Sequence, residues 1–144
     1  MLQLENINAG YNRIQVLHEI NLQVHEGEMV SILGANGAGK TTVFRVISGI
    51  IHPSKGRVLF QGKELHRLST YQVVRAGIGQ VPEGRQVVPS LSVRDHLWLS
   101  AHFGGNYKSE QEIKGELKKI FQLFPILEER SEQLAGSLSG GQQQ

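Results

Sequence analysis

A glycine-rich nonapeptide at residues 34–42 narrows the possible folds of this chain more than any other segment. It reads Gly-Ala-Asn-Gly-Ala-Gly-Lys-Thr-Thr and meets every fixed position of the pattern glycine, four residues, Gly-Lys-Ser/Thr. The apolar run at 29–33 favours a buried strand before it, and the apolar spacing over 41–50 favours a helix after it. We therefore predict an α/β fold in which a strand, a phosphate-binding loop and a helix follow one another. A chance glycine-rich turn is the alternative.

The chemistry of the nonapeptide predicts a nucleoside triphosphate with Mg²⁺ as its ligand. Glycines let the backbone amides turn inward towards an anion, and the N-terminus of the following helix adds about half a positive charge. Lys40 is expected to reach the β- and γ-phosphates, Thr41 to ligate Mg²⁺ and Thr42 to support the α-phosphate. The predicted phosphate-binding residues are Gly34, Ala35, Asn36, Gly37, Ala38, Gly39, Lys40, Thr41 and Thr42.

Length, charge and composition limit the number of domains and the classes of partner that this chain can have. A chain of 144 residues suffices for one domain with a core of its own. The 15 basic and 13 acidic residues leave a net charge of +2 without a block of like charge, so nucleic acid is not indicated as a partner. The absence of cysteine excludes disulfides and thiolate metal sites and suits the cytosol. No apolar run nears the roughly 20 residues that span a bilayer, so we expect membrane contact only through another protein.

Strands are predicted on both sides of the nonapeptide. Apolar and polar residues alternate over 20–24, which is typical of a half-exposed, antiparallel strand. Segments 2–7 and 57–60 are expected to complete a small β-layer with it, and residues 61–63 form the turn after the last of these. Residues 78–81 are predicted to form another buried strand, which ends at Pro82.

The second half of the chain is predicted to be mainly helical. Serine N-caps indicate three helices, over 69–76, 92–102 and 109–124. In the third, Ser109 and Glu112 form a capping box and Pro125 ends the helix. We expect Gly104-Gly105-Asn106 to be a hinge between the second and third helices.

A second motif, Leu138-Ser139-Gly140-Gly141-Gln142, stands near the end of the chain, with Ser139 following Lys40 by 99 residues. Alone, such a pentapeptide is also an ordinary helix cap. Together, the two motifs resemble those of the nucleotide-binding domain of ATP-binding cassette (ABC) ATPases. The segments 77–85 and 88–93 are similar to the branched-chain amino acid transporter ATPases, and less closely to their urea-transport relatives.

The resemblance implies a P-loop NTPase core with an N-terminal antiparallel β-subdomain and a helical subdomain. We place the β-subdomain and core at 1–90 and the helical subdomain at 91–144 of a partial nucleotide-binding domain. In this family, strands that follow the pentapeptide lie between the strands expected here at 29–33 and 78–81. The core sheet is therefore expected to be incomplete in these 144 residues, with association or aggregation as the consequence.

The resemblance also implies roles for single residues. Tyr11 matches the aromatic that stacks on adenine, on a loop after the first strand; a tyrosine packed at a strand edge is the alternative. Glu83 stands where most ABC ATPases have a Mg²⁺-ligating glutamine, so we predict that it binds the metal. Lys40 and Glu83 are the predicted catalytic residues. The alternative for Glu83 is a solvated acidic residue in a loop. Ser139, Gly140, Gly141 and Gln142 are expected to bind nucleotide, with Ser139 and Gly141 contacting the γ-phosphate held by a partner domain.

The function implied is an ATP-binding and hydrolysing subunit that energises an ABC transporter for branched-chain amino acid import. Its expected partners are permease subunits, which would contact segment 91–103, and a second ABC ATPase paired head to tail. That would place it in the cytoplasm on the inner face of the membrane. Family members carry a Mg²⁺-organising aspartate and a water-polarising glutamate beyond the pentapeptide, so nucleotide binding without turnover is an alternative for these residues. A DNA-repair or translation ATPase fits less well, because the interval leaves no room for a coiled coil and only one phosphate loop is present.

Overall fold

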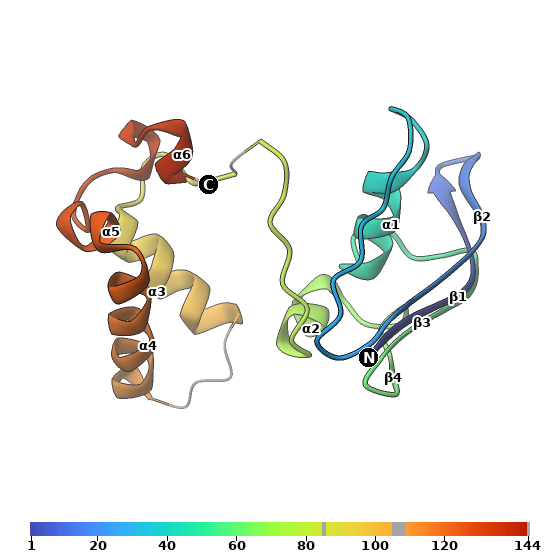
Figure 1. Cartoon of the computed structure of the whole chain (residues 1–144), viewed down its shortest axis with the longest axis horizontal. Coiled ribbons are helices and arrows are strands. Elements are labelled where there is room, and N and C mark those ends of the chain that lie inside the picture. Colours follow the sequence, from blue (N-terminus) through green and yellow to red (C-terminus); the bar gives the residue numbers. More distant parts are fainter. Residues whose placement is uncertain (85, 105–108, 144) are drawn as a thin grey trace. The chain divides into compact units, whose positions relative to one another are not determined.

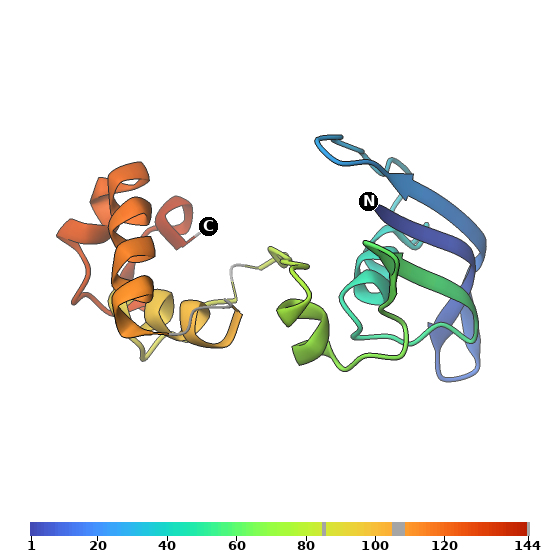
Figure 2. The same ribbon diagram turned by 90° about the horizontal axis from the view of Figure 1, so that it is seen from below.

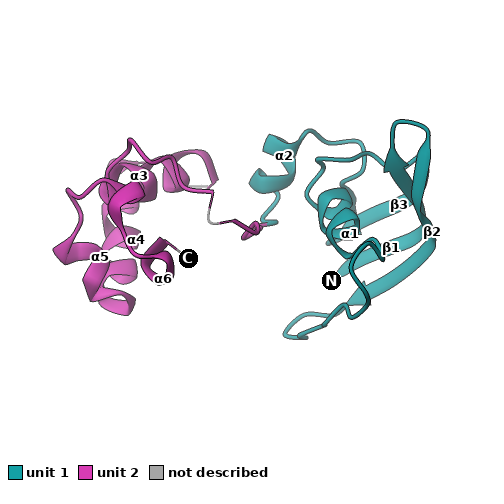
Figure 3. Ribbon diagram, turned by 90° about the horizontal axis from the view of Figure 1, so that it is seen from above, with its two compact units in different colours: residues 1–78 teal, residues 79–144 magenta. Residues whose placement is uncertain are grey.

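The computed structural model describes residues 1–84, 86–104 and 109–143, and these form two compact units, Met1–Ile78 and Gly79–Gln144 (Figure 3). The first unit contains the phosphate-loop motif, and the second contains the pentapeptide. Two residues of the predicted hinge, 105 and 106, lie outside the described residues. The division predicted after residue 90 stays a prediction.

The first unit is built on an antiparallel sheet with the strand order β2-β1-β3-β4 (Figure 1). Its strands are β1 (Leu2–Tyr11), β2 (Ile14–Val24), β3 (Lys55–Phe60) and β4 (Lys63–Glu64). The three strands expected in the β-layer are thus confirmed, and they are longer than predicted. The sheet forms because β1 and β2 are joined by a two-residue connection and pair over almost their whole lengths.

Side-chain amides form hydrogen bonds with the backbone where the pairing of β1 with β2 is irregular. Register shifts interrupt the ladder near Ile7, where Asn6 and Glu19 have φ of +49° and +50°. The Asn21 side chain accepts a hydrogen bond from the Asn6 backbone N–H at 2.9 Å and donates to the Glu19 carbonyl at 2.9 Å. A side-chain amide therefore replaces part of the ladder that the bulge interrupts.

The core of the first unit lies between this sheet and the helix that follows the phosphate loop. That helix, α1 (Lys40–Ile47), packs against one face of the sheet (Figure 2). Its buried Val46 lies in one cluster with Leu4, Ile7 and Val58 of the strands. The core thereby fixes the direction of α1, and with it the position where the loop enters the helix.

A second helix of this unit, α2 (Thr70–Arg75), is capped by Ser69. The Ser69 hydroxyl accepts a hydrogen bond from the Gln72 backbone N–H at 3.4 Å, and Gln72 Oε1 accepts from the Ser69 backbone N–H at 2.9 Å. Val73, fully buried, anchors the helix in the core. The helix predicted over 69–76 is confirmed.

The second unit is helical. It contains α3 (Val93–Gly104), α4 (Glu110–Leu123), α5 (Pro125–Glu129), the 3₁₀ turn η1 (Ala135–Ser137) and α6 (Gly140–Gln143). Ser92 caps α3 through Asp95, and Ser109 caps α4 by accepting from the Glu112 backbone N–H, so both predicted helices are confirmed. None of the helices formed by the described residues combines the length and hydropathy that a bilayer crossing requires.

Two predicted strands, at 29–33 and 78–81, are wrong for this structure. Neither segment is a strand, and Met29, Leu33 and Val81 are 94%, 90% and 76% exposed. A strand needs a neighbour to accept and donate its backbone hydrogen bonds, and within the described ranges neither segment pairs with one. Ile32 and Ile78 nevertheless pack against the core, so each segment keeps one apolar anchor.

Candidate nucleotide-binding site

The phosphate loop owes its shape to two glycines in the left-handed region. Gly37 and Gly39 have φ of +85° and +91°. Gly39 is also the N-cap of α1, and a Cβ at this position would lie 2.8 Å from Leu17 Cδ2. A side chain at residue 39 would therefore be strained by both its backbone and its surroundings. The glycine pattern predicted from the sequence corresponds to a physical requirement at this position.

Lys40 folds back across the loop that precedes it. Its Nζ donates to the carbonyl oxygens of Gly34 at 2.7 Å and Ala35 at 2.8 Å. Two of the three N–H donors of the ammonium thus hold the loop, and the third is left for an anion. The first turn of α1 has no acidic side chain, so the positive charge of Lys40 adds to the positive end of the helix. This electrostatic environment fits phosphate oxygens.

The two threonines after Lys40 have different environments. Thr41 is exposed in the first turn of α1, where its hydroxyl can reach a ligand. Thr42 is buried, and its Oγ1 lies 3.4 Å from the Tyr11 hydroxyl. Among the described residues no group of three acidic or histidine side chains could hold a metal. A Mg²⁺ ion fits this site with phosphate oxygens and water as most of its ligands and one hydroxyl from the protein.

Tyr11 is the last residue of β1, not a loop residue as expected, and it is 38% exposed. Its hydroxyl accepts a hydrogen bond from Arg45 Nη1 at 2.9 Å, and Arg45 Cζ lies 5.7 Å from the ring centroid. The hydrogen bond with Thr42 lowers the pKa of the Tyr11 phenol, the hydrogen bond and charge of Arg45 lower it further, and partial desolvation opposes them.

The contact of Arg45 with Tyr11 was not predicted from the sequence. The sequence contains one indication of this contact: Thr42 and Arg45 are three residues apart in α1, so their side chains lie on the same side of the helix. The structure brings Tyr11, Thr42 and Lys40 into one unit, as the prediction requires. Stacking on adenine remains a prediction.

The pentapeptide begins with an anchored residue and continues into a helix. Leu138 is buried and Ser139 is exposed, and α6 starts at Gly140. Gln142 Oε1 accepts a hydrogen bond from the Ser139 backbone N–H at 3.1 Å. Ser139 therefore directly precedes a short helix and is exposed on the second unit. Its contact with a partner's γ-phosphate stays a prediction.

Glu83 lies in an exposed turn of the second unit, beside Gly84 with φ of +84°. A carboxylate in this setting can accept a hard cation. Its metal and catalytic roles stay predictions.

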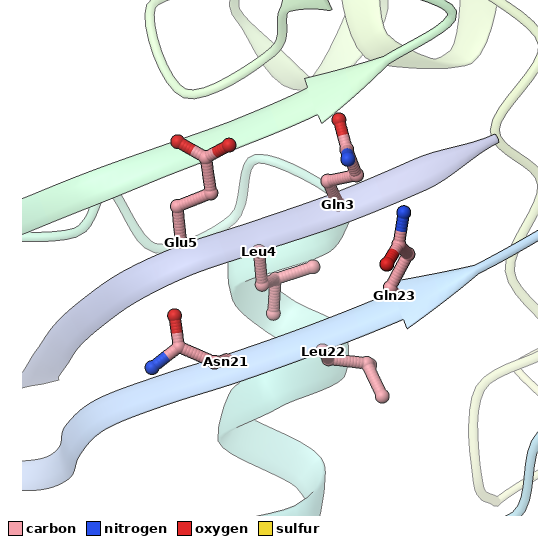
Figure 4. Close-up of a pocket in the computed structure, with 6 residues that line it drawn as sticks. All are labelled: Gln3, Leu4, Glu5, Asn21, Leu22 and Gln23. Atoms are coloured by element: carbon pink, nitrogen blue, oxygen red, sulfur yellow. The ribbon is translucent and has the colours of Figure 1, made fainter.

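A shallow polar depression occupies the outer side of β1 and β2 (Figure 4). It is lined by Gln3, Leu4, Glu5, Asn21, Leu22 and Gln23. The Glu5 carboxylate is already paired with Arg57 Nη2 at 2.6 Å. None of the predicted site residues lines this depression.

Comparison with known proteins gives matches that include both the phosphate loop and the pentapeptide. The family model described as ABC transporter matches residues 17–144. The high-affinity branched-chain amino acid transport ATP-binding protein BraG of Pseudomonas aeruginosa is 38% identical over the whole chain, which covers 60% of that protein. A probable branched-chain amino acid transport ATP-binding protein of Archaeoglobus fulgidus is 28% identical, and the chain covers 59% of it. The chain thus spans about three fifths of these relatives.

Solved structures agree with the sequence comparison. An ATP-binding subunit of an ABC transporter matches with a TM-score of 0.84 and 30% identity, over 99% of this chain and 57% of that one. A dimeric ATP-binding cassette in a post-hydrolysis state, bound to ADP and Pi, matches with a TM-score of 0.83 and 26% identity, over 99% of this chain and 65% of that one. The β-layer and the helices described above are thus arranged within their units as in such cassettes.

Proposed function

The chain belongs to the ABC transporter family as an ATP-binding domain, and on this basis we propose that it binds Mg·ATP at residues 34–42 to energise transport. The observation that carries the proposal is the position of Lys40. Its ammonium lies across the loop, 2.7 Å from the Gly34 carbonyl oxygen, at the positive end of α1. A triphosphate is the ligand whose charge and oxygen donors match this arrangement.

Each group of the site has a part in this proposal. The loop amides and Lys40 would bind the phosphate oxygens, and the Thr41 hydroxyl would hold Mg²⁺. Tyr11 would present its ring to the adenine. When bound, Mg²⁺ supplies the positive charge that phosphoryl transfer requires. Ser139 to Gln142 would bind the γ-phosphate on a second cassette, in a head-to-tail pair.

We place this activity in branched-chain amino acid import. The names of the BraG and Archaeoglobus relatives support this substrate, and their identities of 38% and 28% extend over the whole chain. Permease subunits would be the membrane partners, contacting segment 91–103. The protein would then work in the cytoplasm, on the inner face of the membrane.

Calorimetric titration with Mg·ATP tests the binding proposal. Lys40→Ala removes a charged hydrogen-bond donor worth about 1.5–3 kcal/mol, so we expect affinity to fall about 10- to 100-fold. Lys55→Ala, which removes an exposed lysine from the same unit, is the matched control and should bind as the unaltered chain does. No heat of binding from folded protein would end the proposal.

Binding without turnover is the second candidate for these 144 residues. It is favoured by segment 29–33, which precedes the phosphate loop without a strand neighbour among the described residues. Phosphoryl transfer depends on the precise placement of metal and water, and a loop without that support is suited to binding rather than to catalysis. Phosphate release that Lys40→Ala abolishes would favour the ATPase over this alternative.

A further inference from the structure

We propose that Arg45 is a positioning residue for the nucleotide base, because it holds the Tyr11 ring by its hydroxyl and leaves the ring faces for adenine. This inference depends on the proposed function, since it assigns a role within the same site. It adds to that function a residue that contacts the stacking ring and lies outside the phosphate-loop motif.

The Arg45 guanidinium makes two linked contacts with Tyr11. Its Nη1 donates to the phenolic oxygen at 2.9 Å, and its Cζ lies 5.7 Å from the centroid of the ring. The second distance is within the range of a cation–π interaction. Because the hydrogen bond keeps the guanidinium beside the hydroxyl, both contacts restrain the tyrosine at that end of its side chain.

Thr42 provides the second point of attachment. Its Oγ1 lies 3.4 Å from the same phenolic oxygen, and the threonine side chain is buried. Thr42 and Arg45 both belong to α1, which Val43, Val46 and Ile47 anchor in the core. Tyr11 is therefore fixed to the helix whose N-terminus carries Lys40. The stacking ring and the phosphate loop are held by one rigid element, which sets the distance between base and phosphates.

The arrangement also leaves ring surface on which a base can stack. The guanidinium lies beyond the phenolic oxygen of Tyr11, so it does not cover the faces of the ring. Tyr11 is 38% exposed, which leaves ring surface for a ligand. The lowered pKa of the Tyr11 phenol agrees with these contacts, because Thr42 and Arg45 both favour the phenolate.

The test separates binding of the base from binding of the phosphates. Calorimetry would compare Mg·ATP with Mg·tripolyphosphate, which has no base, for the unaltered chain, Arg45→Met and Arg45→Lys. We expect Arg45→Met to weaken ATP binding about three- to tenfold and to leave tripolyphosphate binding within about twofold. Arg45→Lys keeps a cation near the ring but loses the planar fork, so its loss should be intermediate. Arg57→Met, which removes an exposed guanidinium from β3, should change neither affinity.

A second readout requires no nucleotide. Absorbance titration of the unaltered chain, minus that of Tyr11→Phe, isolates the ionisation of Tyr11 from that of the other tyrosines. The midpoint should rise when Arg45 is replaced by methionine, and less so with lysine. Equal losses for ATP and tripolyphosphate, an unchanged ATP affinity, or an unchanged midpoint would overturn the proposal. If the unaltered chain binds neither ligand, the proposed function fails with it, whereas a raised midpoint would show that the Arg45 contact itself is real.

Discussion

Gly39 shows how strongly one residue can be fixed by its surroundings. Its φ of +91° suits glycine, and a Cβ would meet Leu17 Cδ2 at 2.8 Å. We expect Gly39→Ala to lower the free energy of unfolding by about 1–3 kcal/mol and to weaken Mg·ATP binding. Thermal melts and calorimetry on the same preparation measure both effects.

The matched control is another glycine in a helix. Gly115 lies inside α4, and a Cβ there would meet no atom within 4 Å. Gly115→Ala should therefore raise the free energy of unfolding by about 0.5–1 kcal/mol. Both substitutions add one methyl group, but they should change the free energy of unfolding in opposite directions. A stabilising Gly39→Ala would contradict the conclusion that the loop requires glycine at this position.

Single residues of the site differed in how well the sequence predicted them. The nonapeptide could be found because its residues are contiguous and its pattern specific. Arg45 was missed because its partner Tyr11 is 34 positions away, and the contact exists only once β1 packs on α1. Tyr11 itself was found through the family resemblance alone.

At the scale of elements, the helix caps carry a measurable share of stability. Ser69→Ala removes both the hydroxyl acceptor for the Gln72 N–H and the donor to Gln72 Oε1. We expect the free energy of unfolding to fall by about 1 kcal/mol, measured by urea denaturation. Ser100→Ala, at an exposed position inside α3, is the control and should be close to neutral. An equal loss from both would show that the cap contributes nothing specific.

Local signals explain which elements the sequence predicted. The three capped helices hold their hydrogen bonds within themselves, so a serine and an apolar stripe suffice to locate them. The strands of the β-layer were also found, since β1 and β2 are neighbours along the chain. Segments 29–33 and 78–81 have the composition of strands, but a strand also needs a partner that local sequence does not supply.

At the scale of the whole molecule, the exposed apolar segments predict association. Met29 and Leu33 are 94% and 90% exposed beside unpaired backbone groups. We expect light scattering with size-exclusion chromatography to show oligomers of the 144-residue chain that grow with concentration. Met29→Lys should reduce them, whereas Ile14→Lys, on the paired strand β2, should not. A monodisperse monomer with a cooperative melt would contradict this expectation.

The hold of Lys40 on its own loop has a consequence for ligand capture. The Lys40 ammonium donates to the Gly34 and Ala35 carbonyl oxygens, and these two hydrogen bonds hold the loop in a curved shape. An arriving triphosphate would then meet a ready-made receptor and would lose little ordering entropy on association. Replacing Lys40 would therefore remove a positive charge from the loop and also remove the two hydrogen bonds that restrain its conformation.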